Sequence, residues 1–525
     1  MPSQITTATI EAMATASIDS YLLGGAALLL ALHLLLRRWI LRKPQSRLPM
    51  PPGPRGVPVL GALHLVGASA HSNLARLAAR YGPIMSLRLG SHLCVVASDA
   101  SSARAFLKTA DAQFAHRPDT ISARDVSYQR QNLVMSDATP TWKHMRKLCS
   151  LHLLGGKALA DWAPTRRAEF RRLVDALRRL HDAGQPVPIL DLLICTLSNV
   201  VGTIAVSGRV FDDHGDESNK FKDVLSDMLT GGAQFNVGDF FPSIAWMDLQ
   251  GIQAKMLSVH KRFDAMVSRL FEEHQRTRES RRGAPDFIDK VMANRVSEDG
   301  ATISDVNVRA LIFDLLTAGT DTSSTIVEWT LAEMLTNPAI LRRLQAETEG
   351  VVGRDRLLEE SDIPNLPYLQ AVCKEALRLH PSTPLMLPHF SHEDCEVGGF
   401  FIPKHTRLLV NVWAIGRDPA VWENPLTFDP DRFLPGGKGA RYDPMCNDGN
   451  FGFIPFGAGR RSCAAKLLGM LFVQYLVGTL AHAFDWELPE GEEEIDMEAK
   501  PGLVLPKAVP LKAFARPRLS PAAYV

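Results

Sequence analysis

The C-terminal part of the chain reads Phe456-Gly457-Ala458-Gly459-Arg460-Arg461-Ser462-Cys463-Ala464-Ala465, which sets one cysteine in a loop of glycine and arginine residues. An apolar run with the pattern of a helix follows at residues 467–476. A cysteine thiolate is stabilised by nearby cations and by the N-terminus of a helix, and Arg460 and Arg461 directly precede this cysteine. The segment therefore indicates a thiolate that binds a metal centre. For a single cysteine, the alternative is a buried or free thiol beside a basic turn.

The loop resembles the ligand loop of the cytochrome P450 monooxygenases, whose signature is matched by Phe456, Gly459, Arg461 and Cys463. In that family the thiolate binds the iron of haem b and pushes electron density toward bound oxygen. The resemblance implies that Cys463 is the axial ligand of iron and that Phe456 and Arg461 contact the haem. Ala465 departs from the family pattern, which has glycine at this position packed closely against the haem, so its methyl group is expected to shift the thiolate or weaken haem retention.

A second segment, Lys374-Glu375-Ala376-Leu377-Arg378, places Glu375 and Arg378 three residues apart. On a helix these two side chains share a face and can pair, and Arg432 from Asp431-Arg432-Phe433 can join them. A Glu-x-x-Arg pair alone is common on surface helices. With the cysteine loop downstream, the resemblance implies the family's Glu-Arg-Arg triad, a structural lock behind the haem.

A third segment lies inside a helical pattern that runs from about residue 305 to 337, before Pro338. Ala318-Gly319-Thr320-Asp321-Thr322-Ser323 puts a glycine, hydroxyls and a carboxylate where a core helix should be apolar, as expected at a functional site. The resemblance implies that the helix bends over the haem here to open an oxygen groove, with Thr322 and Asp321 assisting proton delivery to bound dioxygen. The alternative is a loop that joins two shorter helices.

Trp142 and Arg146 lie four residues apart and would face one way on a helix. The resemblance implies that both bind a haem propionate, for which guanidinium and indole donors are suited. His389 lies where members of the family carry Arg or His for the other propionate. The alternative for the Trp/Arg pair is an ordinary amphipathic surface helix.

The N-terminal part contains an almost uninterrupted apolar stretch at residues 21–36, extended by Trp39, Ile40 and Leu41, which is long enough to cross a bilayer if these flanks are included. Acidic residues precede it and basic residues follow it, so the C-terminal flank is expected to stay cytosolic, whereas a cleaved secretory signal has its basic residues first. We therefore predict a lumenal N-terminus (1–20), a single transmembrane anchor (21–41), a basic and proline-rich hinge (42–58) and a haem-thiolate monooxygenase domain (59–525), held at the endoplasmic reticulum membrane with the catalytic domain in the cytosol.

Helical periodicity dominates the rest of the chain, with short strand-like runs at residues 84–89, 93–97, 395–402 and 406–411. This pattern predicts a mainly α fold with minor β sheets, which the resemblance identifies with the cytochrome P450 fold enclosing haem. The net charge of +1 gives no indication of a nucleic-acid partner. The seven cysteines include no Cys-x-x-Cys pair, which favours reduced thiols and provides no zinc framework.

The sequence contains neither a complete dinucleotide-binding fingerprint nor a P-loop, so electrons for oxygen chemistry must come from another protein. The resemblance implies that NADPH is used indirectly, through NADPH-cytochrome P450 reductase, with cytochrome b5 as a second candidate donor. Four basic residues are candidate docking charges, and the alternative for each is a solvated surface position: Lys143, Lys147, Arg460 and Lys466.

Several segments resemble plant flavonoid B-ring hydroxylases, and two of them, with the 507–511 tail, favour the branch that hydroxylates the 3′ and 5′ positions. The alternatives are 3′-hydroxylation, a haem-thiolate monooxygenase acting on another phenolic or terpenoid substrate, and a non-catalytic haem-binding scaffold of the same pathway. The segments that carry the resemblance are 154–159, 235–240, 245–251 and 380–385.

Some positions expected to touch the flavonoid substrate depart from the family. Residues 128–135 differ from its usual acidic and aromatic loop, and Met386 and Val504 add bulk to a site that must admit a flat phenolic ring. The sequence therefore determines the type of reaction better than it determines which ring position is hydroxylated. The candidate pocket residues are Ala318, Thr383, Leu385, Met386 and Val504.

Overall fold

The computed structural model describes residues 48–524 except 214, 235, 446–448 and 492–493. The predicted lumenal segment, the anchor and the first part of the hinge therefore lie outside the described residues. The chain forms two compact units, of which residues 50–398 and 402–525 make up the larger. In the smaller unit the backbone N–H of Phe401 donates to the carbonyl oxygen of Pro49 at 2.9 Å.

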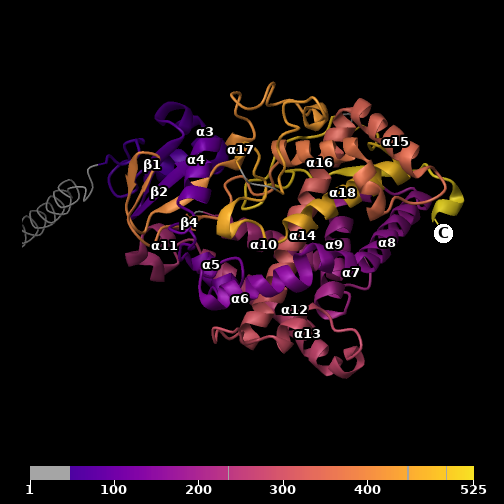
Figure 1. The fold of residues 1–525 in the computed structure, drawn as a ribbon, viewed down its shortest axis with the longest axis horizontal. Helices are drawn as coiled ribbons and strands as arrows, with labels where there is room; N and C mark the ends of the chain where they lie inside the picture. Colours follow the sequence, from indigo (N-terminus) through magenta and orange to yellow (C-terminus); the bar gives the residue numbers. More distant parts are fainter. Residues whose placement is uncertain (1–47, 214, 235, 446–448, 492–493, 525) are drawn as a thin grey trace, which may run out of the picture. The chain divides into compact units, whose positions relative to one another are not determined.

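Helices make up most of the larger unit, with one long helix, α14, running through the middle (Figure 1). It packs against α9, α12, α16 and α18. The longer helices are α3 (Ala70–Tyr81), α6 (Pro140–Cys149), α8 (Ala163–Asp182), α9 (Ile189–Val206), α10 (Asp216–Ala233), α12 (Ile252–Arg276), α14 (Asp305–Thr336), α15 (Pro338–Val352), α16 (Pro367–Leu379) and α18 (Lys466–Ala483), and the shorter ones are α2 (Leu63–Val66), α4 (Ala100–Arg104), α5 (Ile121–Val126), α7 (Gly156–Asp161), α11 (Val237–Phe240), α13 (Phe287–Ala293) and α17 (Val412–Ile415).

The ends of α14 follow from local signals. Ser304 caps the helix by accepting from the backbone N–H of Asn307, whose side chain accepts in return from the backbone of Ser304. Pro338 begins α15 at its first helical positions, where its missing N–H costs nothing. The helix is continuous between these signals, which excludes the alternative of a loop joining two shorter helices.

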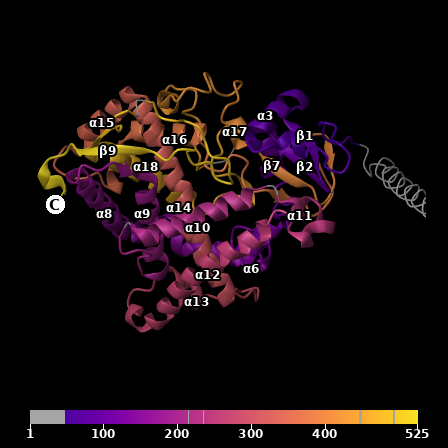
Figure 2. The same ribbon diagram turned by 180° about the vertical axis from the view of Figure 1, so that it is seen from behind.

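Two of the core helices are long and apolar enough to cross a membrane. Within the described part of the chain these are α9 and α18, and both are mostly buried inside the protein. A helix that is apolar all round is typical of the interior of a large domain. Figure 2 shows α10 beside α9. Helix α10 contacts both α9 and α12.

Small sheets complete the fold. The sequence predicts their strands within 84–97 and 395–411, but not those at 187–188, 389–390, 484–487 and 512–517. The first sheet has the order β1-β2-β7-β4, in which β2 and β7 are parallel and the other pairs antiparallel. The second has the antiparallel order β3-β9-β8. The mainly α class with minor sheets is thus confirmed. The strands are β1 (Ile84–Leu89), β2 (His92–Ala97), β3 (Val187–Pro188), β4 (His389–Phe390), β5 (Cys395–Val397), β6 (Phe400–Ile402), β7 (Arg407–Val410), β8 (Phe484–Glu487) and β9 (Lys512–Pro517).

Candidate active site

A cavity of about 320 Å³ lies where α14, α6 and the loop before α18 meet. Thr322 of α14, Trp142 and Arg146 of α6, and Cys463 and Arg461 of the loop all line it. The structure therefore brings into one cavity residues that the sequence places more than 300 positions apart.

In the cysteine loop, position 459 has a backbone conformation and surroundings that only glycine can adopt. The backbone N–H of Cys463 donates to the carbonyl oxygen of Phe456 at 2.8 Å, which closes the loop. Gly459 has φ +71°, and a Cβ atom there would lie 2.4 Å from the carbonyl oxygen of Leu107 and from Oδ1 of Asp111. Both the left-handed backbone and the close approach therefore require glycine at position 459.

The thiol of Cys463 is open to the cavity although protein surrounds it. Burial raises the pKa of Cys463, and the backbone N–H of Ala465 and the charges of Arg146 and Lys466 act against this increase. The sequence assigned this stabilisation to Arg460 and Arg461, which is wrong. The side chains of these two arginines point to other partners, Asp111 for Arg460 and the carbonyl oxygens of Ala115 and Ser136 for Arg461.

Ala465, the departure from the family's glycine, is accommodated without strain. Its φ of −97° is an ordinary value for an L-residue, and it precedes the first residue of α18. The side chain is partly buried against the core and lines the cavity. The backbone at this position therefore does not need glycine.

Three arginines, Arg117, Arg146 and Arg461, face the same cavity. Burial lowers the pKa of Arg117 to about 9, and the charges of Arg461 and Arg146 lower it further. Burial likewise lowers the pKa of Arg461 to about 10, against the attraction of Asp137. The indole ring of Trp142 lies 4.2 Å from the guanidinium carbon of Arg461 and 5.5 Å from that of Arg146. Such buried, mutually repelling cations suit a bound dianion.

The haem group fits this cavity by its chemistry. It would bring two propionate carboxylates to the three arginines and an iron atom to the thiol of Cys463. The only carboxylate that lines the cavity among the described residues is Asp314. Its oxygens already accept from the side chain of Asn132 at 2.6 Å and from the backbone N–H groups of Leu133 and Val134 at 2.7 and 3.1 Å. Asp314 is therefore engaged elsewhere, and no carboxylate of the described lining is available to the three arginines.

Trp142 and His389 lie at the cavity as the sequence predicts, but their donors are directed elsewhere. The indole N–H of Trp142 donates to the carbonyl oxygen of Leu133 at 2.9 Å. Nδ1 of His389 lies 2.9 Å from the carbonyl oxygen of Phe114, which can only accept, so Nδ1 carries the proton. Burial, and then the charge of Arg117, lower the pKa of His389 to about 3, which keeps the imidazole neutral.

The polar turn of α14 contributes Ala318 and Thr322 to the cavity lining. The hydroxyl of Thr322 donates to the carbonyl oxygen of Ala318 at 2.7 Å. Asp321 does not line the cavity, and burial raises the pKa of its carboxyl group to about 7. A Cβ atom on Gly319 would lie 3.4 Å from a methyl group of Val201 of α9, an ordinary contact, so the packing of the two helices does not require glycine here.

Glu375, Arg378 and Arg432 form a fully buried cluster. Arg378 pairs with Glu375 through two contacts of 2.7 Å, and Nε of Arg432 lies 3.0 Å from Oε1 of Glu375. Arg378 also donates to the carbonyl oxygens of Gly416 and Pro425. The cluster therefore ties α16 to the loops that precede the cysteine segment.

The five pocket candidates separate into two groups. Ala318, Thr383 and Met386 line the cavity. Leu385 packs instead against the core of the first sheet, and Val504 is buried without being part of the lining. Met386 adopts a φ of +53°, a strained conformation for a residue with a side chain.

Of the four candidate docking charges, Lys143 and Lys147 are exposed on α6. Arg460 is also exposed, but pairs with Asp111 at 2.8 Å. Nζ of Lys466 donates to the carbonyl oxygen of Met445 at 2.6 Å. Only the two lysines of α6 are thus presented to a partner as simple surface charges.

Sequence reasoning missed two residues of the site, Arg117 and Asp314. Arg117 donates to the carbonyl oxygens of Leu387 and Pro388 at 2.8 and 2.9 Å, so it joins two distant segments at the cavity wall. No sequence pattern marks it. Asp314 could have been found, because it is a charged residue within the apolar run 311–316.

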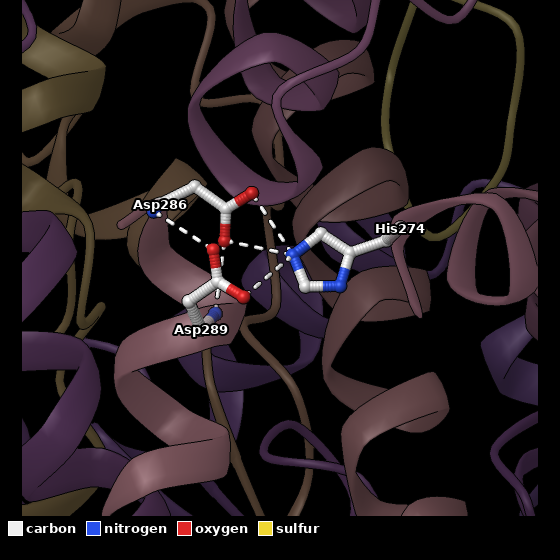
Figure 3. A group of neighbouring side chains, drawn as sticks. All are labelled: His274, Asp286 and Asp289. Atoms are coloured by element: carbon white, nitrogen blue, oxygen red, sulfur yellow. Dashed lines mark hydrogen bonds and ion pairs between the residues drawn. The ribbon is translucent and has the colours of Figure 1, made fainter. Parts of the chain in front are cut away.

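A second group of metal-ligating side chains, His274, Asp286 and Asp289, lies away from the cavity at the ends of α12 and α13 (Figure 3). Nε2 of His274 lies 2.9 Å from Asp286 and 3.5 Å from Asp289. Arg281 contacts both carboxylates, at 3.3 and 2.9 Å. Asp286 also accepts from the hydroxyl of Ser207 at 2.8 Å. The carboxylates are thus satisfied by protein groups, and we assign this cluster a structural role.

The comparisons with known proteins agree with this geometry. The family model described as cytochrome P450 matches residues 51–511. A flavonoid 3′,5′-hydroxylase of Eustoma exaltatum subsp. russellianum is 52% identical over 470 residues, which cover 90% of this chain and 92% of that protein. A flavonoid 3′-monooxygenase of Crocosmia x crocosmiiflora is 47% identical and covers 91% of this chain and 94% of its own length. The solved structure of a zebra fish cytochrome P450 with progesterone has a TM-score of 0.72 and 25% identity, covering 85% of this chain and 99% of that one.

Proposed function

The chain belongs to the cytochrome P450 family of haem-thiolate monooxygenases, and we propose that it hydroxylates the B-ring of flavonoids at the 3′ and 5′ positions. The observation that carries the proposal is the similarity to flavonoid 3′,5′-hydroxylases, which extends over nine-tenths of the chain. The cavity supports haem binding, because a thiol and three arginines line it, of which Arg117 is buried and the other two are partly buried.

Haem, when bound, supplies the activation of dioxygen from which one oxygen atom enters an aromatic C–H bond. Cys463 would ligate the iron, which its position in the cavity lining supports, and Phe456 closes the same loop through its carbonyl oxygen. Arg117, Arg146 and Arg461 would hold the propionates, and the ring of Trp142 supports two of these arginines. His389 would join them only after gaining a proton, because its one N–H is already bonded to Phe114.

On the opposite wall, Thr322 would present its hydroxyl to the oxygen side of the cavity and receive protons from the neighbouring Asp321. A carboxyl group whose pKa is raised to about 7 by burial is suited to donate and recover a proton near neutral pH. Ala318, Thr383 and Met386 would contact the flavonoid ring and set which of its positions reaches the iron.

Two alternatives have support of their own. Hydroxylation at 3′ alone is favoured by the similarity to flavonoid 3′-monooxygenases and by the bulk of Met386 in its strained turn. A different phenolic substrate is the nearest variant of this alternative. A non-catalytic haem-binding scaffold rests on the methyl group of Ala465, which lines the cavity, and haem content of the purified protein tests it.

We further propose that residues 21–41 anchor the chain once in the endoplasmic reticulum membrane, after a lumenal segment at 1–20 and before the hinge at 42–58. The monooxygenase domain would then face the cytosol, where NADPH-cytochrome P450 reductase, assisted by cytochrome b5, would deliver electrons. The exposed lysines Lys143 and Lys147 are the candidate contacts.

The experiment combines membranes containing the protein, a plant reductase and NADPH with a panel of substrates, and weighs the products by mass spectrometry. A flavanone with one B-ring hydroxyl should gain two oxygens. A gain of one oxygen would establish the 3′-hydroxylase alternative. No gain with any flavonoid, at confirmed reductase activity and haem content, would refute the proposal.

A further inference from the structure

One face of α14 carries a row of polar groups that the cavity does not use. Asp321, Thr325 and Glu328 are spaced by four and then three residues, which places their side chains along the same face of the helix. Thr325 and Glu328 are fully buried. None of the three lines the cavity, so this row lies beside the wall formed by Ala318 and Thr322.

Two atoms in this row lack hydrogen-bond partners among the described protein atoms. They are the hydroxyl oxygen of Thr325 and Oε2 of Glu328. Other buried hydroxyls of the same helix are satisfied, since Ser324 donates to the carbonyl oxygen of Thr320 and Thr330 to that of Ile326. A buried polar group left unpaired costs about 1–3 kcal/mol, so these two atoms call for an explanation.

The other oxygen of Glu328 has a structural role. Oε1 accepts from the backbone N–H of Leu511 at 2.8 Å, and the carbonyl oxygen of Leu511 accepts in turn from the backbone N–H of Ile189. Ile189 begins α9, and the partly exposed Asp191 lies two residues further on, in the first turn. Glu328 is thus linked, through the buried Leu511, to the first residue of α9.

Both carboxyl groups of the row can change protonation near neutral pH. Burial raises the pKa of Asp321 to about 7. Burial also raises the pKa of Glu328 to about 7, while the N–H of Leu511 and the charge of Lys507 lower it and the charges of Asp191 and Asp321 raise it. Lys507, Asp191 and Asp321 are the charged groups that act on Glu328.

We propose that Glu328 and Thr325 relay protons from the α9 end of the molecule to Asp321, an inference that rests on the proposed monooxygenase function. Because no direct hydrogen bond joins the three side chains, Glu328 gives its proton through bridging water to the hydroxyl of Thr325 as that hydroxyl passes its own proton, again through water, to the carboxylate of Asp321. Glu328 then recovers a proton from solvent water, so the row returns to its starting charge. Two helical turns separate the carboxyl groups, about 10 Å along the axis, which the hydroxyl and bridging waters can span.

The relay explains why these two polar atoms are present although they lack partners, which side-chain packing alone does not explain. Valine has the same shape as threonine. If position 325 served packing alone, valine would therefore fill it at little cost in stability. A glutamate whose second oxygen is unpaired would serve the N–H of Leu511 equally well as glutamine. Thr325→Val and Glu328→Gln therefore remove the proton pathway while leaving the packing in place.

The test compares Thr325→Val and Glu328→Gln with Thr330→Val in the full-length holoenzyme, at equal haem content. Thr330 is the matched control, because it is a fully buried threonine of the same helix whose hydroxyl is bonded to a carbonyl. The relay variants should yield several-fold less product per NADPH, release the difference as peroxide and show a larger solvent deuterium isotope effect. Thr325→Ser should restore wild-type coupling. Wild-type coupling and isotope effect in Thr325→Val would overturn the proposal.

An infrared measurement tests the relay without turnover. At neutral pH the wild-type protein should show infrared bands of protonated carboxyl groups. Glu328→Gln should remove one component of these bands and shift the component of Asp321. Thr330→Val should change neither component. An unchanged carboxyl spectrum in Glu328→Gln would contradict the relay. If no flavonoid is hydroxylated by the wild-type protein, the proposed substrate fails, and the infrared result still decides for or against the relay.

Discussion

The guanidinium group of Arg461 lies over the indole ring of Trp142, 4.2 Å from the ring centroid. Nε and Nη2 of the arginine donate to the carbonyl oxygens of Ala115 and Ser136. The stack and these two bonds fix the guanidinium at the cavity wall, with Nη1 remaining for an anion. The adjacent Arg460 points the opposite way, toward Asp111.

Arg461→Ala should therefore weaken haem retention, whereas Arg460→Ala should not. A hydrogen bond to a charged group contributes about 1.5–3 kcal/mol, so haem should dissociate about tenfold more readily or worse. The measurement is haem content per protein after gel filtration, together with the rate of haem transfer to an acceptor protein. Equal haem retention in the two variants would refute the assigned role of Arg461.

Cys463→Ala should abolish the thiolate-type absorption band of the reduced carbon monoxide complex. The thiol is the only sulfur of a cysteine among the described residues that lines the cavity. Cys395→Ala, at a partly exposed cysteine outside the cavity, serves as the control and should keep the band. A band that survives in Cys463→Ala would show that another group ligates the iron.

Thr322→Ala should uncouple NADPH consumption from product formation, by roughly tenfold in product per NADPH, with peroxide released. The cause is the loss of the hydroxyl that the helix presents to the oxygen side of the cavity. Thr336→Ala is a matched control, since its hydroxyl makes the same bond to the residue four positions earlier, at 2.9 Å, but lies at the end of α14. Full coupling in Thr322→Ala would exclude this role.

Glu375→Ala should destabilise the fold by about 3–5 kcal/mol, because it leaves Arg378 and Arg432 buried without their counter-charge. Glu423 provides the comparison, since it pairs with Lys438 at 2.6 Å on the exposed surface and its substitution should leave the stability almost unchanged. Denaturant unfolding followed by tryptophan fluorescence measures both. Similar midpoints for the two variants would contradict a locking role of the triad.

The fold was predictable where local signals are strong. The 305–337 helix has a capping serine at one end and Pro338 at the other, so its bounds differ from Asp305–Thr336 by a single residue. The strand-like runs at 84–89 and 93–97 pair as β1 and β2. In β1 the buried Leu87 and Leu89 alternate with polar residues, as the two faces of a strand require. Glu375 and Arg378 pair because a spacing of three fixes their proximity on a helix.

The site was predictable in its members but less so in its contacts. Arg460 and Arg461 are neighbours in sequence, yet their directions depend on Asp111 and on the stack with Trp142, which only tertiary packing brings near. The direction of Leu385 also depends on tertiary packing, because its side chain packs against the first sheet and not into the cavity. Arg117 acts through carbonyl groups some 270 positions away, which no local pattern reveals.

The most direct test of B-ring hydroxylation is to supply isotopically labelled dioxygen to the protein with a plant reductase, NADPH and a flavanone bearing one B-ring hydroxyl, and to locate the label by fragment mass spectrometry. The account predicts two labelled oxygens, both on the B-ring and both derived from dioxygen. Label on another ring, oxygen derived from water, or an unchanged flavanone in the presence of haem-loaded protein would contradict it.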